Sequence, residues 1–111
     1  METVTLTLRT LEGEPFATVQ AQPTSTPGLL IHHAADSDGW RLAHQSGLPI
    51  AEFTTDQMAR HTATYLGSLA DWTRSPEELR SVRNLLHEVA TVISVANGVL
   101  LLNPGTNPTT Y

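Results

Sequence analysis

The sequence contains no cysteine and no lysine among its 111 residues. Without cysteine there can be no disulfide, no thiolate nucleophile and no cysteine-ligated metal. The six basic residues are all arginines, scattered along the chain, and eleven acidic residues give a formal net charge of −5. Because nucleic-acid binding through phosphates needs clustered cations, we expect no direct nucleic-acid partner.

Long apolar runs and the common catalytic signatures are also missing. No run of about 18 apolar residues occurs, so the sequence predicts no spanning helix and no membrane partner. The first residues, Met1-Glu2-Thr3, lack the basic and apolar regions of a signal peptide, and we expect a cytoplasmic protein. The sequence has no Gly-x-Ser-x-Gly elbow, no Walker loop and no Gly-x-Gly-x-x-Gly turn. It therefore predicts neither an enzyme nor a bound cofactor.

Alternating apolar and polar residues fill the first half of the chain. Val4, Leu6 and Leu8 alternate with threonines, which is the period-2 pattern of a half-buried strand. Similar patterns separated by Gly, Pro and Asp clusters predict five strands, over residues 3–10, 16–22, 29–34, 40–44 and 48–53. Pro49 places the last of these strands at an edge of the sheet.

The register of the second hairpin follows from its side chains. If Ile31 lies opposite Leu42, one face carries Leu29, Ile31, His33, Trp40, Leu42 and His44. The other face then carries Leu30, His32, Arg41 and Ala43. A slip of one residue would mix the two faces, which a sheet with one buried side avoids.

Two helices are predicted in the second half. Thr54-Thr55-Asp56 begins the first, which carries an apolar stripe and ends near Asp71 or Trp72. Ser75-Pro76-Glu77-Glu78 is a capping box for a second helix of about 22 residues, ending at Asn97-Gly98. Alternatively, residues 89–102 break into a shorter helix and a strand, because β-branched residues dominate there.

Strands followed by helices segregate into layers. We therefore expect an α+β fold, with an antiparallel sheet of four or five N-terminal strands packed on one face by two C-terminal helices. Residues 1–102 form a single domain in this interpretation. Residues 103–111, rich in proline and threonine, form a flexible C-terminal tail.

The candidate binding residues are histidines and tryptophans: Trp72, His32, His33, Trp40 and His44. His33 and His44 share a face but lie about 12 Å apart along the strands, from ~3.3 Å per residue, so no metal site is predicted. Trp72, at the expected helix end, is either a core residue or a partly exposed contact residue. The histidines are structural, or they contact a ligand or partner.

The apolar second half of the second helix also allows two interpretations. It packs on the first helix and the sheet, or it mediates self-association through an interface of Val89, Val92, Ile93 and Ala96. We favour the first interpretation, while the helix length and its nearly all-round apolarity support the second, a homodimer.

Two segments, Gly28–His33 and Gly39–Gly47, together with residues 69–73, resemble small accessory proteins carried on phages and mobile elements of GC-rich bacteria. The resemblance covers residues 28–73 and implies an accessory or inhibitor protein that acts by binding another protein. We therefore expect a small non-enzymatic protein-interaction module, whose partner is another protein or a second copy of itself. The alternative is a small-ligand or metal-binding domain that uses the histidine-rich hairpin, and a third hypothesis is a small hydrolase or isomerase with histidine as acid–base.

Overall fold

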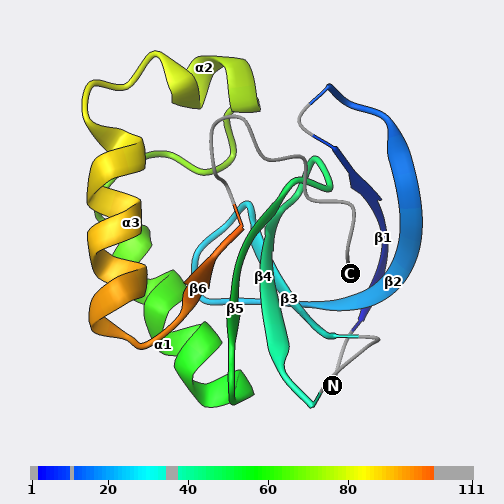
Figure 1. Cartoon of the computed structure of the whole chain (residues 1–111). Coiled ribbons are helices and arrows are strands. Elements are labelled where there is room, and N and C mark those ends of the chain that lie inside the picture. The colour runs from blue at the N-terminus through cyan, green and yellow to red at the C-terminus, as the bar shows by residue number, and fades with distance from the viewer. Residues whose placement is uncertain (1–2, 11, 35–37, 102–111) are drawn as a thin grey trace.

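The computed structural model describes residues 3–10, 12–34 and 38–101, and it has an α+β fold (Figure 1). Six antiparallel strands form one sheet in chain order: β1 (Val4–Arg9), β2 (Pro15–Pro23), β3 (Leu29–His33), β4 (Trp40–His44), β5 (Pro49–Phe53) and β6 (Val99–Leu100). Between β5 and β6 come three helices: α1 (Asp56–Leu66), α2 (Pro76–Arg80) and α3 (Leu85–Val95). The predicted fold class is confirmed. The tail predicted over 103–111 lies outside the described residues.

The predicted register of the β3–β4 hairpin is confirmed. Ile31 pairs with Leu42, and the flanking pairs follow in step: His33 with Trp40 and Leu29 with His44. The helices cover the face that carries Leu29, Ile31 and Leu42, which belong to the main core. The opposite face is buried as well, which the sequence did not predict.

The opposite face is covered by the β1–β2 hairpin. β2 pairs with β1 along most of its length but with β3 only through Gln22 and Pro23, so it curves around the sheet (Figure 1). Small and medium side chains fill the space between hairpin and sheet: Leu6, Leu8, Ala21 and Ala43, with Phe16, Ala17, Val19 and Leu30 packed against them. The chain therefore has two cores, one on each side of β3 and β4.

The end of β1 is fixed to the turn between β4 and β5. The amide of Arg9 donates to the carbonyl of Gly47 at 2.9 Å. Gly47 has φ +99°, and a Cβ there would lie 1.9 Å from the carbonyl oxygen of Thr7. Only glycine fits this approach, because it tolerates positive φ and lacks a side chain.

Helix α1 begins where predicted but ends earlier. Thr55 is its N-cap, and its hydroxyl accepts from the amide of Met58. The helix ends at Leu66 rather than near Asp71 or Trp72, because the indole Nε1–H of Trp72 donates to the Leu66 carbonyl at 2.7 Å. The face toward the sheet consists of Ala59, Thr62, Ala63 and Leu66. Small side chains let the helix approach closely, while Tyr65 is 59% exposed.

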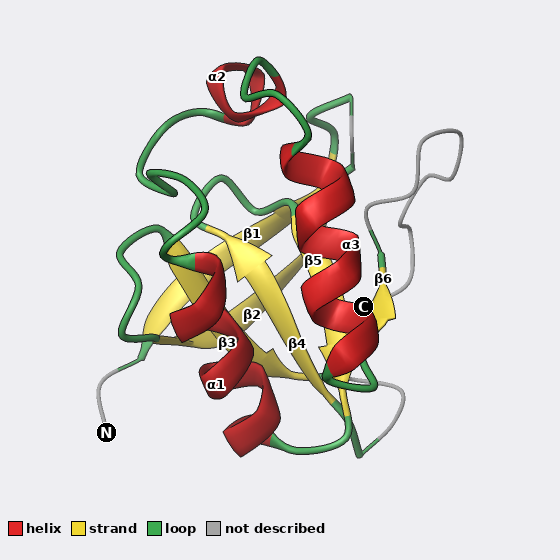
Figure 2. Ribbon diagram, turned by 90° about the vertical axis from the view of Figure 1, so that its left-hand side faces the viewer, coloured by secondary structure: helices red, strands yellow, loops and turns green. Residues whose placement is uncertain are grey.

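The predicted 22-residue helix is wrong, because the chain breaks at Asn84. The capping box of Ser75 and Glu78 is confirmed, but α2 ends at Arg80. Asn84 adopts the left-handed conformation, with φ +62°, which asparagine tolerates better than most residues. Figure 2 shows α2 beyond the N-terminal end of α3, while α1 and α3 cover the same face of the sheet.

A Schellman motif ends α3, as the predicted Asn97-Gly98 cap required. Asn97 has φ +59°, and the amide of Gly98 donates to the Ile93 carbonyl at 2.9 Å. The chain then forms β6, where Leu100 pairs with Ala51 of β5. The alternative of a shorter helix followed by a strand is confirmed, and the edge position predicted for β5 is wrong. Among the described residues, no helix is both long and apolar enough to cross a membrane.

Candidate functional site

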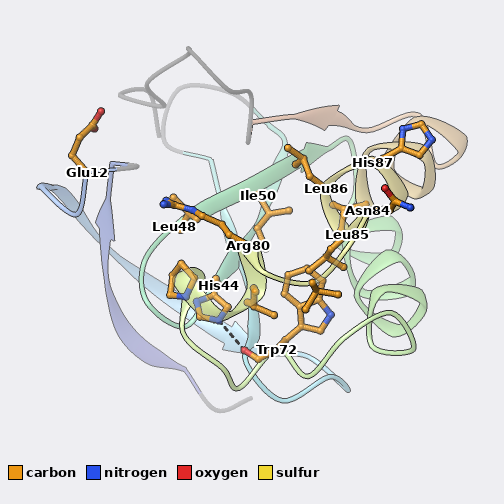
Figure 3. Close-up of a pocket in the computed structure, with 14 residues that line it drawn as sticks. Glu12, His44, Leu48, Ile50, Trp72, Arg80, Asn84, Leu85, Leu86 and His87 are labelled. Atoms are coloured by element: carbon orange, nitrogen blue, oxygen red, sulfur yellow. Dashed lines mark hydrogen bonds between the residues drawn. The ribbon is translucent and has the colours of Figure 1, made fainter.

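A pocket of about 580 Å³ opens between α2, the start of α3 and the adjoining ends of β4 and β5 (Figure 3). Its wall is mainly apolar and comprises Leu48, Ile50, Trp72, Pro76, Leu79, Val82, Leu85, Leu86 and Val89. Polar side chains from the same lining are Glu12, His44, Arg80, Asn84 and His87. Small-molecule sites in proteins have this volume, about 300–1,000 Å³, and this apolar character.

The break at Asn84 creates this pocket. A continuous helix would carry Leu79 and Val89 along one straight face. Instead, Leu79 reaches the pocket from α2, while Leu85 and Val89 reach it from α3. All three side chains are buried, and the fully buried Ile50 of β5 lies on the wall that faces them.

His44 anchors one wall of the pocket. Its Nε2–H donates to the carbonyl of Trp72 at 2.8 Å, drawn as the dashed line in Figure 3. Its Nδ1 accepts from the backbone amide of Ser46 at 3.1 Å and lies 2.9 Å from the Ser46 hydroxyl. Burial lowers the pKa of His44, against the smaller raising effect of the Trp72 carbonyl. The imidazole is therefore neutral near pH 7, and both of its nitrogens are engaged.

Trp72 is a buried wall residue and not an exposed contact. It is 4% exposed, and its carbonyl approaches Gly28 so closely that a Cβ there would lie 2.1 Å from the oxygen. Gln45 adds a hydrogen bond from its side-chain amide to the Thr73 carbonyl at 3.0 Å. These contacts tie the loop after α1 to the start of β3 and the end of β4.

The structure does not bring all the predicted binding residues together. His44 and Trp72 meet at the pocket, but His33 and Trp40 lie at the far end of the hairpin, where their rings stack edge-on at 5.1 Å. His32 lies on the opposite face of the sheet. No group of three or more histidine, aspartate or glutamate side chains in the described part of the chain is placed to hold a metal.

The buried His32 is only half satisfied. Its Nδ1 lies 3.0 Å from the carbonyl of His33, whereas Nε2 has no hydrogen-bond partner among the described residues. Burial lowers the pKa of His32, and the charge of Arg41 acts in the same direction. The hydroxyl nearest to His44 belongs to Ser46, which is not among the residues that line the pocket.

The residues predicted as a dimer interface mostly face inward. Val89 and Ile93 belong to the main core, and Val92 and Ala96 are half-buried against it, so all four pack on the chain's own core. The exposed apolar side chains of this segment are instead Leu86, Val95 and Val99, at 42%, 80% and 61%.

The sequence did not single out Arg80, Leu79 or Leu85 as site residues. The available signal was Asn84, a residue prone to the left-handed conformation between two apolar segments. No family model, curated protein or solved structure matches this chain. The described lining of the pocket is mainly apolar, and its geometry suits binding.

Proposed function

We propose that the protein is a non-enzymatic binding protein that holds a small, largely apolar molecule in the pocket between α2, α3 and β5. The observation that carries this proposal is an open pocket of about 580 Å³ that is lined mainly by apolar side chains from three separate elements. Two of the predicted ligand-contacting residues, His44 and Trp72, contribute to the wall.

The wall is preorganised, which favours binding. The hydrogen bonds of His44 to Trp72 and of Trp72 to Leu66 fix the loop on one side of the pocket without a ligand. Each CH₂ group that a ligand buries contributes about 0.8 kcal/mol. A ligand with ten buried carbons therefore gains roughly 8 kcal/mol, of which lost translational and rotational freedom removes several kcal/mol. We expect dissociation constants of about 0.1–1 mM.

A neutral fluorescent probe tests the pocket directly. N-phenyl-1-naphthylamine should bind the protein saturably at one site, with increased fluorescence. The variant Val82→Phe fills the pocket from its half-buried wall position, and we expect it to weaken probe binding by about tenfold or more.

Val95→Phe is the matched control, because Val95 is exposed on α3 and does not line the pocket. It should bind the probe as the unmodified chain does. Absence of saturable binding, or equal binding by the unmodified chain and Val82→Phe, would contradict the proposal. Thermal unfolding of each variant shows that a loss of binding is not a loss of fold.

The second candidate is the protein-interaction module, an accessory or inhibitor protein that binds another protein or itself. The exposed apolar side chains Leu86, Val95 and Val99 favour it, because large exposed apolar groups often mark interfaces. The mass in solution tests the homodimer. A single species of 12.0 kDa at all concentrations contradicts it, and a dimer lost in Val95→Asp supports it.

A further inference from the structure

We infer that the pocket selects an anionic amphiphile with a single alkyl chain, whose head group is bound by Arg80 and whose chain lies among the apolar side chains. This inference rests on the proposed function of the pocket and adds the chemical class of the ligand. It rests on the position of Arg80 in the pocket lining and on a guanidinium that has no partner among the described residues.

Arg80 is the last residue of α2 and lines the pocket. Figure 3 shows its side chain running along the pocket toward Leu48, with the guanidinium beside the apolar wall. No hydrogen bond or ion pair joins this guanidinium to any other described residue. Five donors therefore stand at the edge of an apolar space without an acceptor among the residues that the structure describes.

Other arginines of the chain are engaged in a way that Arg80 is not. Arg41 bonds to Glu52 at 2.7 Å, and two others form looser pairs with an aspartate one helical turn away or less: Arg60 with Asp56 and Arg74 with Asp71. Arg80 has acidic neighbours in sequence, Glu77 and Glu78. The carboxylate of Glu78 is held by the capping box with Ser75, at the other end of α2.

The other charged and titratable groups of the lining do not offset Arg80. Glu12 is the acidic residue of the lining, and Figure 3 shows its carboxylate directed away from the remaining side chains. His87 lies on the far side, beside Asn84 at the start of α3. His44 is occupied by Ser46 and Trp72.

The chemistry of the arginine selects the head group. A guanidinium binds a carboxylate or a phosphate through two parallel hydrogen bonds, and such charge-assisted bonds are about twice as strong as neutral ones. A cationic head group would be repelled at the same position. The net charge of −5 opposes a bound anion only weakly, because exposed charges more than about 8 Å away are largely screened at physiological salt.

Three ligands with the same chain and different head groups test the inference. Decanoate, decan-1-ol and decyltrimethylammonium, each below its critical micelle concentration, compete with the neutral naphthylamine probe at neutral pH. We expect decanoate to bind about tenfold more tightly than decanol and decyltrimethylammonium to bind more weakly than both.

The variant Arg80→Gln keeps a polar side chain of similar length. It should reduce decanoate binding by about tenfold, to the level of decanol, and leave decanol binding unchanged. Arg83→Gln is the matched control, because Arg83 is exposed in the neighbouring turn and does not line the pocket. It should leave the binding of all three ligands unchanged.

Three negative outcomes are distinguishable. Equal binding of decanoate and decanol, both unaffected by Arg80→Gln, overturns the head-group inference and leaves the apolar pocket standing. If no ligand competes and the naphthylamine probe itself fails to bind, the proposed function falls and this inference falls with it. An equal loss of decanoate binding in Arg80→Gln and Arg83→Gln would show a general charge effect and also overturn the assignment to Arg80.

Discussion

The two faces of the sheet bury one histidine each, and the two histidines are held very differently. His44, on the helix face, has both ring nitrogens engaged and joins β4 to the loop before α2. His32, on the hairpin face, lacks a partner for Nε2. Burial lowers the pKa of both side chains. We therefore expect His44, which connects separate segments, to stabilise the fold more than His32 does.

The two faces are also closed by different means. On the hairpin face, β1 and β2 form a continuous ladder, and short side chains such as Ala21 and Ala43 fill the space beneath it. On the helix face, the five-residue α2 connects to α3 through the turn at Asn84, and a pocket lies beside it. The pocket therefore lies where turns, rather than strand pairing, position the elements.

The largest expected effect concerns the closest backbone approach on the helix face. Gly28→Ala places a Cβ 2.1 Å from the carbonyl oxygen of Trp72 at a residue with φ +94°. Strain and overpacking together should lower the free energy of unfolding by about 3 kcal/mol or more. Chemical denaturation measures this loss.

Gly13→Ala is the control, since Gly13 has φ +87° but nothing within 4 Å of the new Cβ. It should cost only the conformational strain, about 1–2 kcal/mol. Equal losses in the two variants would show that the Trp72 carbonyl does not pack tightly against β3.

Replacing each buried histidine by leucine tests most directly the difference between His44 and His32. His44→Leu leaves the Trp72 carbonyl and the Ser46 amide without their partner and should cost about 2–3 kcal/mol. His32→Leu removes a side chain whose Nε2 is already unsatisfied, so its expected cost is below about 1 kcal/mol. Urea unfolding of both variants compares these values. A larger loss in His32→Leu than in His44→Leu would refute the account.

The two buried histidines, His32 and His44, should also make the fold less stable in acid. Both pKa values are lowered below the ordinary 6.5, so the unfolded chain binds more protons than the folded one. The contribution of the two neutral histidines to the free energy of unfolding should be fully present above about pH 6.5. It should be lost as the pH drops below that value, by up to about 1.4 kcal/mol per pH unit for each histidine. Unfolding curves between about pH 5 and 8 measure this slope. The slope should become shallower in His32→Leu, and an unchanged slope would exclude His32 as a contributor.

The smallest expected effect lies at the break between α2 and α3. Asn84→Ala puts alanine into a left-handed conformation and should cost about 1 kcal/mol. Asn84→Gly should be neutral or slightly stabilising, because glycine adopts this conformation without strain. Thermal unfolding ranks the two variants. A stabilised Asn84→Ala variant would show that the chain prefers the continuous helix.

Much of the sheet was predictable because its signals are local. The alternation that places Ile31 opposite Leu42 fixed the register of β3 and β4. The break at Asn84 was missed because the apolar spacing of three and four continues across it, from Leu79 to Val89. Hydrophobic periodicity does not reveal that a single residue adopts the left-handed conformation.

The rest of the site depends on contacts between residues far apart in the sequence. The bond from Trp72 to Leu66 shortens α1, and the bond from His44 to Trp72 forms the pocket wall. The curvature of β2 follows from its pairing with β3 through only Gln22 and Pro23. Neither local propensity nor hydrophobic spacing encodes these contacts, so the pocket could not be predicted from the sequence.

The central claim is that the helix face, and not the hairpin face, holds an apolar ligand. Amide NMR spectra recorded during a titration with decanoate test it most directly. We predict saturable shifts confined to residues around the pocket, such as Ile50, Leu79 and Leu85, and unchanged signals from Leu6 and Leu8 in the second core. Shifts on the hairpin face, or no saturable shifts at all, would contradict the account.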